Sequence, residues 1–230
     1  MKKLLALLPL IGAFALAGCG GEKEENNSDS GNGSEAAHYD VSQEEAKQRV
    51  KTLEADGYEI QFKHSSSSTE GDEESGTATV GAKDGYYWYF DEGSKDMFHI
   101  SAERVLTAYE YDSEHNVFKV EDSDLLPVEF YESCFEGLAA NLYCGFQFNG
   151  LEGLTKVGST TKAGRQATEY RYAAAGYGVS VSQKVIVDNE TGITLYWGVE
   201  GHTIEGEGGE ASFEVLSFKT GAAVSVPAHE

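Results

Sequence analysis

The three cysteines carry the most reactive side chains of this 230-residue chain. Cys134 and Cys144 are near enough in sequence to form a disulfide in an exported protein. On an unbroken helix the ten residues from one to the other would span about 15 Å, whereas a disulfide needs Cα atoms within about 7 Å. A bridge therefore requires the chain to turn back between them. The sequence leaves two alternatives open, a disulfide or two buried thiols.

The other side chains with chemical potential form no recognisable site. The six histidines are scattered without the paired spacing of a zinc site. The pattern Asp112-x-Glu114-x-Asn116 alternates as calcium ligands do, but it lacks the loop glycine and the distal glutamate, which favours a turn. The stretch Gly178-Val-Ser180 lacks the second glycine of a nucleophile elbow, and no phosphate loop or dinucleotide fingerprint is present. We therefore expect no cofactor, no metal and no catalysis, although distant residues can still assemble a catalytic group in space.

Cys19 lies at the end of a leader sequence. Lys2 and Lys3 precede an apolar run, Leu4 to Ala17, that is too short to span a bilayer comfortably, as in an export signal. The stretch Leu16-Ala17-Gly18-Cys19 resembles a bacterial lipobox. This resemblance implies that residues 1–18 are removed and that the Cys19 thiol carries a diacylglyceryl group. The alternative is a secreted protein in which Cys19 is incidental.

The charge of the chain limits its partners. The sequence has 39 acidic and 17 basic residues and a net charge of −22. Such a charge argues against nucleic acid and against docking on anionic headgroups. Membrane attachment would therefore depend on the acyl chains of Cys19, and stable anchoring takes two or more such chains. We expect a bacterial envelope protein on the outer face of the cytoplasmic membrane, or on the outer membrane of a Gram-negative cell.

The composition changes twice along the chain and predicts three parts. Residues 1–18 are the signal peptide, residues 19–38 are the lipidated cysteine with a disordered tether, and residues 39–230 are one folded domain. From Gly20 to Ala37 no apolar residue is larger than alanine, so this stretch cannot offset its ordering entropy by burial. Its r.m.s. reach would be about 21–25 Å.

The folded part begins with one helix and then changes to the period of a strand. The capping box of Ser42 and Glu45 predicts a helix over Val41–Asp56. Tyr58, Ile60 and Phe62 then alternate with polar residues, which is typical of a strand. Further strands are expected at 77–83, 86–91, 96–101, 104–112, 117–121, 154–159, 165–173, 179–188, 193–200 and 211–220.

Two further features complete this prediction. Asp84-Gly85 is a strong hairpin signal, and residues 124–148 carry large or apolar side chains every four residues, which favours a helical segment. The fold class is α+β, with a large curved antiparallel sheet, a half-open β-barrel of about ten or eleven strands. The N-terminal helix and the mid-chain helical segment would pack on this sheet.

Two stretches within residues 58–227 carry a resemblance to a known family. One runs from Leu106 to Asp112 and, after a turn, from Val117 to Val120. The other begins with Gly164-Arg165 and Tyr170. It continues as Val-Asp-x-x-Thr-Gly-x-x-Leu from Val187 to Leu195 and ends as Phe213-Glu-Val215. Together they resemble the LolA/LolB-like superfamily of bacterial envelope proteins. The resemblance implies a half-open barrel with an apolar cavity for acyl chains, in a carrier or a lipid-responsive sensor.

Aromatic residues supply the candidate cavity. Alternation places Tyr86, Trp88 and Phe90 on one face of their strand and Tyr87 and Tyr89 on the other. One interpretation is that an aromatic face lines a hydrophobic cavity. The alternative is that these side chains form ordinary core, because aromatic residues bury large areas wherever they lie. The candidate cavity residues are Tyr86, Trp88, Phe90, Leu195, Trp197 and Phe213.

Two functional hypotheses from different classes follow. The first is a membrane-anchored envelope lipoprotein that binds a lipid or an acylated peptide, as a carrier or sensor without catalysis. The second is a cell-surface interaction module with a packed core that binds a protein or glycan partner. An apolar cavity open to solvent would favour the first, and a filled interior would favour the second.

Overall fold

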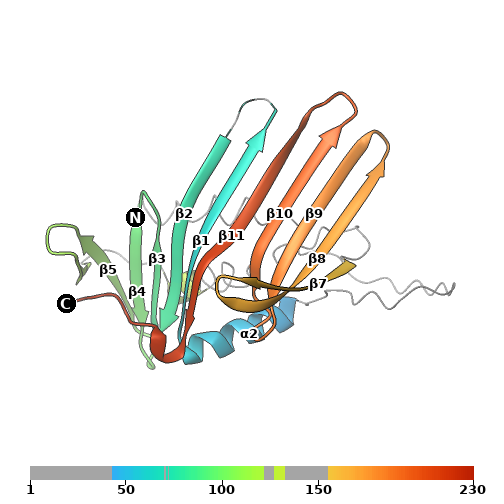
Figure 1. Cartoon of the computed structure of the whole chain (residues 1–230). Helices are drawn as coiled ribbons and strands as arrows, with labels where there is room; N and C mark the ends of the chain where they lie inside the picture. Colours follow the sequence, from blue (N-terminus) through green and yellow to red (C-terminus); the bar gives the residue numbers. More distant parts are fainter. Residues whose placement is uncertain (1–42, 70, 72, 122–126, 133–154) are drawn as a thin grey trace.

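The structure, a computed structural model, describes residues 43–69, 71, 73–121, 127–132 and 155–230 (Figure 1). The leader, the tether with Cys19, and the cysteines Cys134 and Cys144 lie outside these residues. The anchor and the disulfide therefore stay predictions. Among the described residues, no helix has the length and apolar character needed to span a bilayer.

Within the described residues, eleven strands form a single antiparallel sheet, which confirms the predicted sheet and its size. The helix α2 (Gln43–Asp56) precedes them, and the 3-10 turn η2 (Gly221–Ala223) follows them. The strands are β1 (Tyr58–Ser68), β2 (Glu73–Lys83), β3 (Tyr86–Phe90), β4 (Lys95–Ile100), β5 (Leu106–Asp112), β6 (Val117–Val120), β7 (Thr155–Lys162), β8 (Arg165–Gly176), β9 (Val179–Asp188), β10 (Thr194–Thr203) and β11 (Gly208–Thr220).

The sheet consists of two meanders that share one junction. The strand order is β6-β5-β4-β3-β2-β1-β11-β10-β9-β8-β7, so β1 and β11 join the two halves. Within the described residues no pairing joins β6 to β7, and the sheet is open. The chain between β6 and β7 connects the two edges. In this connection residues 128–132, which belong to the helical segment predicted over 124–148, are helical. Residues 124–126 and 133–148 of that segment lie outside the described residues.

The β7–β8 end of the sheet is strongly curved. Lys162 of β7 forms an ion pair with Glu214 of β11, although three strands lie between β7 and β11 in the sheet. The Lys162 Nζ also lies 5.6 Å from the ring centroid of Tyr196 in β10. A flat sheet would hold β7 too far from β11 for this contact, since neighbouring strands are about 4.8 Å apart. Figure 1 shows β7 crossing the lower ends of its neighbours.

Two-residue turns connect several of the strands. The predicted Asp84-Gly85 turn is confirmed, with φ angles of 53° and 78°. Such paired positive φ angles belong to the tight turns that match the twist of a hairpin. Tyr177 and Gly178, between β8 and β9, have φ angles of 52° and 81°. A tyrosine in this region is uncommon, because a side chain with a Cβ is strained there.

One face of the sheet, here called the helix face, packs against α2. It carries Tyr58, Ile60 and Phe62 of β1, which are buried as the alternation predicts. Leu53 of α2 packs against this cluster, and the helix ends where the Gly57 N–H donates to the Leu53 carbonyl at 2.8 Å. Figure 1 shows α2 along the lower end of the sheet.

The opposite face of β3–β6, here called the tail face, is covered by the C-terminal residues 221–230. Trp88 and Phe118 are buried there together with Val224. The Lys83 ammonium donates to the carbonyls of Gly221 and Val224 at 3.1 and 2.7 Å. The tail then runs beside Phe118, whose N–H donates to the Ala228 carbonyl at 2.9 Å. It thus covers the outer edge of β6, one end of the open sheet.

Candidate hydrophobic binding face

The six candidate cavity residues lie on two different faces of the sheet. Leu195, Trp197 and Phe213 belong to the main core of the helix face. Tyr86, Trp88 and Phe90 belong to the cluster of the tail face. The sheet therefore does not bring the two groups together. It divides the aromatic run of β3 as its alternation predicts, with Tyr87 and Tyr89 packing on the helix face.

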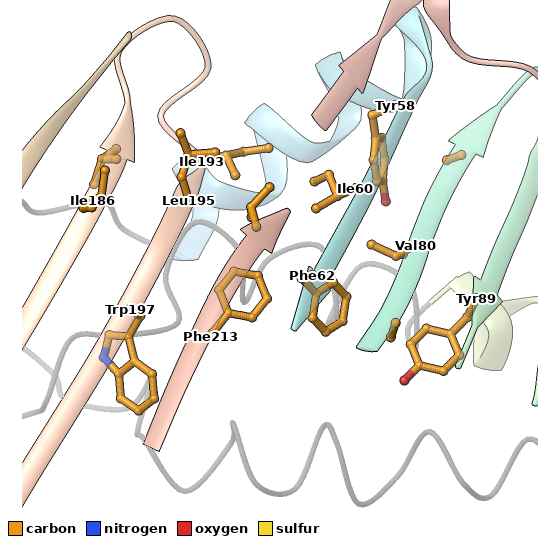
Figure 2. Packing of buried hydrophobic residues seen from close by; sticks show 14 of the residues in the cluster. Tyr58, Ile60, Phe62, Val80, Tyr89, Ile186, Ile193, Leu195, Trp197 and Phe213 are labelled. Carbon is orange, nitrogen blue, oxygen red and sulfur yellow. The ribbon is translucent and has the colours of Figure 1, made fainter. Parts of the chain in front are cut away.

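Strand register places the large side chains of the helix face in one row. His64 of β1 lies opposite Phe213 of β11, which lies opposite Trp197 of β10, and Trp197 lies opposite Val185 of β9. Directly paired residues of an antiparallel sheet project to the same face. The rings of Phe62 and Phe213 are 5.0 Å apart at 36°. Figure 2 shows Trp197, Phe213 and Phe62 side by side, away from the end of the face covered by α2.

A second aromatic group continues the face toward β4. Phe98 stacks on Tyr87 at 5.1 Å and meets Tyr131 edge-on at 5.0 Å. Tyr131 belongs to the helical residues 128–132, so the connection between β6 and β7 also packs on the helix face. The sequence analysis did not name Phe98 or Tyr131 as site residues. Period-two alternation over 95–100 assigns Phe98 to the face opposite Met97, but nothing local indicates which face Tyr131 joins.

A histidine of β1 extends the aromatic row with a polar group. The His64 Nδ1 is buried, and no described residue bonds to it. Its ring lies over Gly76 of β2, where an added Cβ would be 2.8 Å from Cε1. An unsatisfied buried polar group costs about 1–3 kcal/mol. His64 therefore offers a hydrogen bond beside an apolar surface.

The hydroxyl of Tyr89 on the helix face is neutral because of its surroundings. Burial raises the pKa of the Tyr89 hydroxyl, and the carboxylates of Asp91 and Asp96 raise it further. Tyr89 therefore stays neutral and adds no charge to the face. Among the described residues, no three histidine, cysteine or acidic side chains are grouped to hold a metal.

A buried ion pair fixes the turn at the α2 end of the sheet. Arg165 donates to both carboxylate oxygens of Asp188 at 2.8 and 3.0 Å, and its guanidinium lies 4.8 Å from the ring of Phe218. Burial opposes ionisation of Asp188, but hydrogen bonds from Arg165 and Thr191 outweigh it and lower the pKa. Every oxygen of Asp188 is therefore engaged in holding two hairpins together. This cluster is structural.

The helix face continues from the aromatic row toward the far ends of β9 and β10. Val199 pairs with Gln183, Gly201 with Val181, and Thr203 with Val179. These pairs share the face of Trp197 and Val185, because the register does not shift between them. The residues of β9 become more exposed along this path, since Val185 and Gln183 are buried. Val179 at its end is 46% exposed.

Comparison with solved structures finds matches that cover most of the chain. LprF from Mycobacterium bovis has 11% identity and a TM-score of 0.36, with 80% of this chain and 96% of that chain covered. A LolA superfamily protein, NE2245 from Nitrosomonas europaea, has 6% identity and a TM-score of 0.25, covering 82% and 96%. A DUF1329 family protein from Desulfovibrio piger has 10% identity and a TM-score of 0.25, covering 80% and 93%. No protein-family model and no curated protein matches.

These similarities are too weak to carry an argument about this chain, since each TM-score is below 0.5. The LolA/LolB-like resemblance of the sequence therefore stays a resemblance.

Proposed function

We propose that this chain is an envelope lipoprotein that holds the apolar part of a lipid or an acylated peptide on its helix face, without chemical turnover. The observation that carries the proposal is the row of Phe62, Phe213 and Trp197 across three adjacent strands. These three side chains are 1–7% exposed, so an acyl chain reaches the row only after the groups that cover it move aside. Removing the surface of the acyl chain from water then supplies about 25 cal/mol per Å².

His64 adds a polar end to this apolar row. Its buried Nδ1 has no protein partner among the described residues, and it lies opposite Phe213. A ligand with a hydroxyl or carboxyl group next to its acyl chain would satisfy that nitrogen. This favours an amphiphile over a plain hydrocarbon.

Attachment to the membrane belongs to the same proposal. The lipobox Leu16-Ala17-Gly18-Cys19 supports an acyl anchor on Cys19, followed by the tether over residues 20–38. A Cys19→Ser chain is expected to leave the membrane fraction. A native chain that begins at another residue, or whose Cys19 thiol is free, would contradict the anchor but would leave the binding face untouched.

The two tryptophans of the chain provide a direct test, because they lie on opposite faces of the sheet. Trp197 belongs to the helix face and Trp88 to the tail face. The full chain is titrated with a brominated fatty acid, whose bromines quench nearby indoles. We expect quenching in the Trp88→Phe variant, which retains Trp197, and none in the Trp197→Phe variant, which retains Trp88. His64→Leu is expected to weaken binding of the fatty acid about tenfold or more, but not binding of the matching hydrocarbon.

Each other outcome has a defined meaning. Quenching of Trp88 alone would place the ligand on the tail face and refute the proposed site. The side chains of the row are buried in this structure. An interaction module with a packed core would have the same buried row. Absence of quenching in both variants, with no lipid recovered from the purified native chain, would therefore refute the carrier and favour that module.

A further inference from the structure

The most exposed apolar side chains of the described residues gather at the tips of two hairpins. Tyr177, in the β8–β9 turn, is fully exposed, and Ile204, in the β10–β11 turn, is 86% exposed. Val179 stands next to them at the start of β9. Exposed apolar residues that gather in this way mark a contact site, because single ones are scattered on most surfaces.

The two turns are held together, so these side chains form one unit. The Ile204 N–H donates to the Gly178 carbonyl at 2.8 Å, which joins the tip of one hairpin to the tip of the other. The Ile204 side chain passes 3.5 Å from the position that a Cβ on Gly178 would take. Tyr177 keeps a positive φ of 52° at this tip, a strained conformation that favours glycine. A fully exposed aromatic residue at such a position gains nothing from the fold of its own chain.

The shape and charge of this tip decide what it can contact. Three projecting side chains present far less than the roughly 800 Å² that each partner contributes to a standard protein interface. A bilayer accepts such a projection, and tyrosine prefers the boundary between headgroups and acyl chains. Residues 176–179 and 203–208 contain no lysine or arginine, and Glu205 and Glu207 belong to the second turn. The tip therefore suits an uncharged or zwitterionic lipid surface.

We propose that the tip formed by Tyr177, Val179 and Ile204 inserts into the headgroup boundary of a lipid bilayer and passes the hydrophobic ligand between the bilayer and the helix face. The path is the line of side chains that leads from Val179 through Val181 and Val199 to Trp197. The contact between the tip and the bilayer is inferred from the exposure of the tip. The passage of the ligand rests on the proposed function.

A reporter at the tip tests the contact. The full chain with Tyr177→Trp is mixed with phosphatidylcholine vesicles whose acyl chains carry bromine close to the headgroup. We expect the emission of the introduced indole to be quenched and shifted to shorter wavelength. The matched control is Val105→Trp, because Val105 is 59% exposed and lies in the loop between β4 and β5, at the opposite end of the sheet. Its emission is expected to stay unchanged.

A second variant tests the transfer. In Tyr177→Ser combined with Ile204→Ser, uptake of a fluorescent fatty acid from these vesicles is expected to slow about tenfold or more, since both side chains that would enter the bilayer lose their apolar surface. The affinity for the same fatty acid added in solution is expected to be unchanged. Adding anionic lipid should weaken the contact, and salt should restore it.

Three results would overturn the proposal. One is equal quenching of the indoles at the tip and at the control position. Another is unchanged uptake from vesicles by the double variant. The third is self-association of the chain that the double variant abolishes, which would make the tip a protein contact. Failure of the proposed function would give another result. The chain would then bind no fatty acid, whether it is supplied in vesicles or in solution, but the indole at the tip would still be quenched by the bilayer.

Discussion

Replacing Gly81 with alanine is expected to destabilise the protein strongly, because the Trp88 ring occupies the space that a side chain would need. Gly81 and Trp88 lie opposite each other in β2 and β3. A Cβ on Gly81 would lie 2.2 Å from both Cε2 and Cζ2 of the indole, well inside van der Waals contact. The ring cannot move aside easily, since Trp88 is 0% exposed and packs with Met97, Phe118 and Val224.

The size of this effect follows from overpacking. Forcing one extra carbon into a packed core typically costs about 1–3 kcal/mol, and the depth of this overlap places Gly81→Ala near the upper end, at about 3 kcal/mol. Urea unfolding followed by far-UV circular dichroism measures the change in the free energy of unfolding. Gly158→Ala in β7 is the matched control, because a Cβ there meets nothing within 4 Å. It should stabilise the chain by about 0.5 kcal/mol, since glycine within a strand is unfavourable.

A double-mutant cycle separates this clash from other effects. In a Trp88→Leu background, Gly81→Ala should cost less than about 1 kcal/mol, because the smaller side chain leaves room for the Cβ. An equally large cost in both backgrounds would show that the indole is not the obstacle. A cost of Gly81→Ala similar to that of Gly158→Ala in the natural chain would refute the reasoning altogether.

Three further variants test other contacts. Arg165→Met leaves the buried Asp188 carboxylate without its cation and should lower the free energy of unfolding by about 3 kcal/mol at neutral pH. The pKa of Asp188 is lowered in the folded chain. The stabilisation from its carboxylate is therefore present above the unfolded pKa of about 3.9 and is lost as the pH falls through the folded pKa. In urea titrations, the difference in the free energy of unfolding between the natural and Asp188→Asn chains should shrink over that pH range. Val224→Ala should lower the free energy of unfolding by about 2 kcal/mol and expose the Trp88 indole. The exposure is measured as a red shift of the Trp88 emission in a Trp197→Phe background. The control, Val105→Ala, should change the free energy of unfolding by less than about 0.5 kcal/mol.

Alternation and turn residues were sufficient to predict the elements of the fold. The buried alternation of Tyr58, Ile60 and Phe62 and the Asp84-Gly85 turn have local causes, and both are confirmed. The far ends of the strands were predicted too short. The strand expected at 77–83 begins at Glu73, and the one expected at 211–220 begins at Gly208. Their serine, glycine and acidic residues carry no apolar alternation, because both sides of the sheet are open to solvent there.

The division of the candidate cavity could not be predicted from the sequence. Alternation shows that Trp88 and Tyr89 face opposite ways, but it does not relate Trp88 to Trp197 on another strand. That relation depends on register, and a shift of one residue reverses every side chain of a strand. Irregularities at Gln61/Phe62 and at Thr194/Tyr196 introduce such shifts into the sheet. Pairing of β1 with β11 joins residues far apart in sequence and has no local signal.

That pairing also has a consequence for how the newly made chain reaches its final form. The six strands from β1 to β6 can pair with one another before the rest of the chain is made, yet the backbone amides and carbonyls on the other edge of β1 stay unpaired until β11 is made. A long unpaired strand bearing Tyr58, Ile60 and Phe62 invites association with other nascent molecules. We therefore expect chains truncated before Gly208 to aggregate.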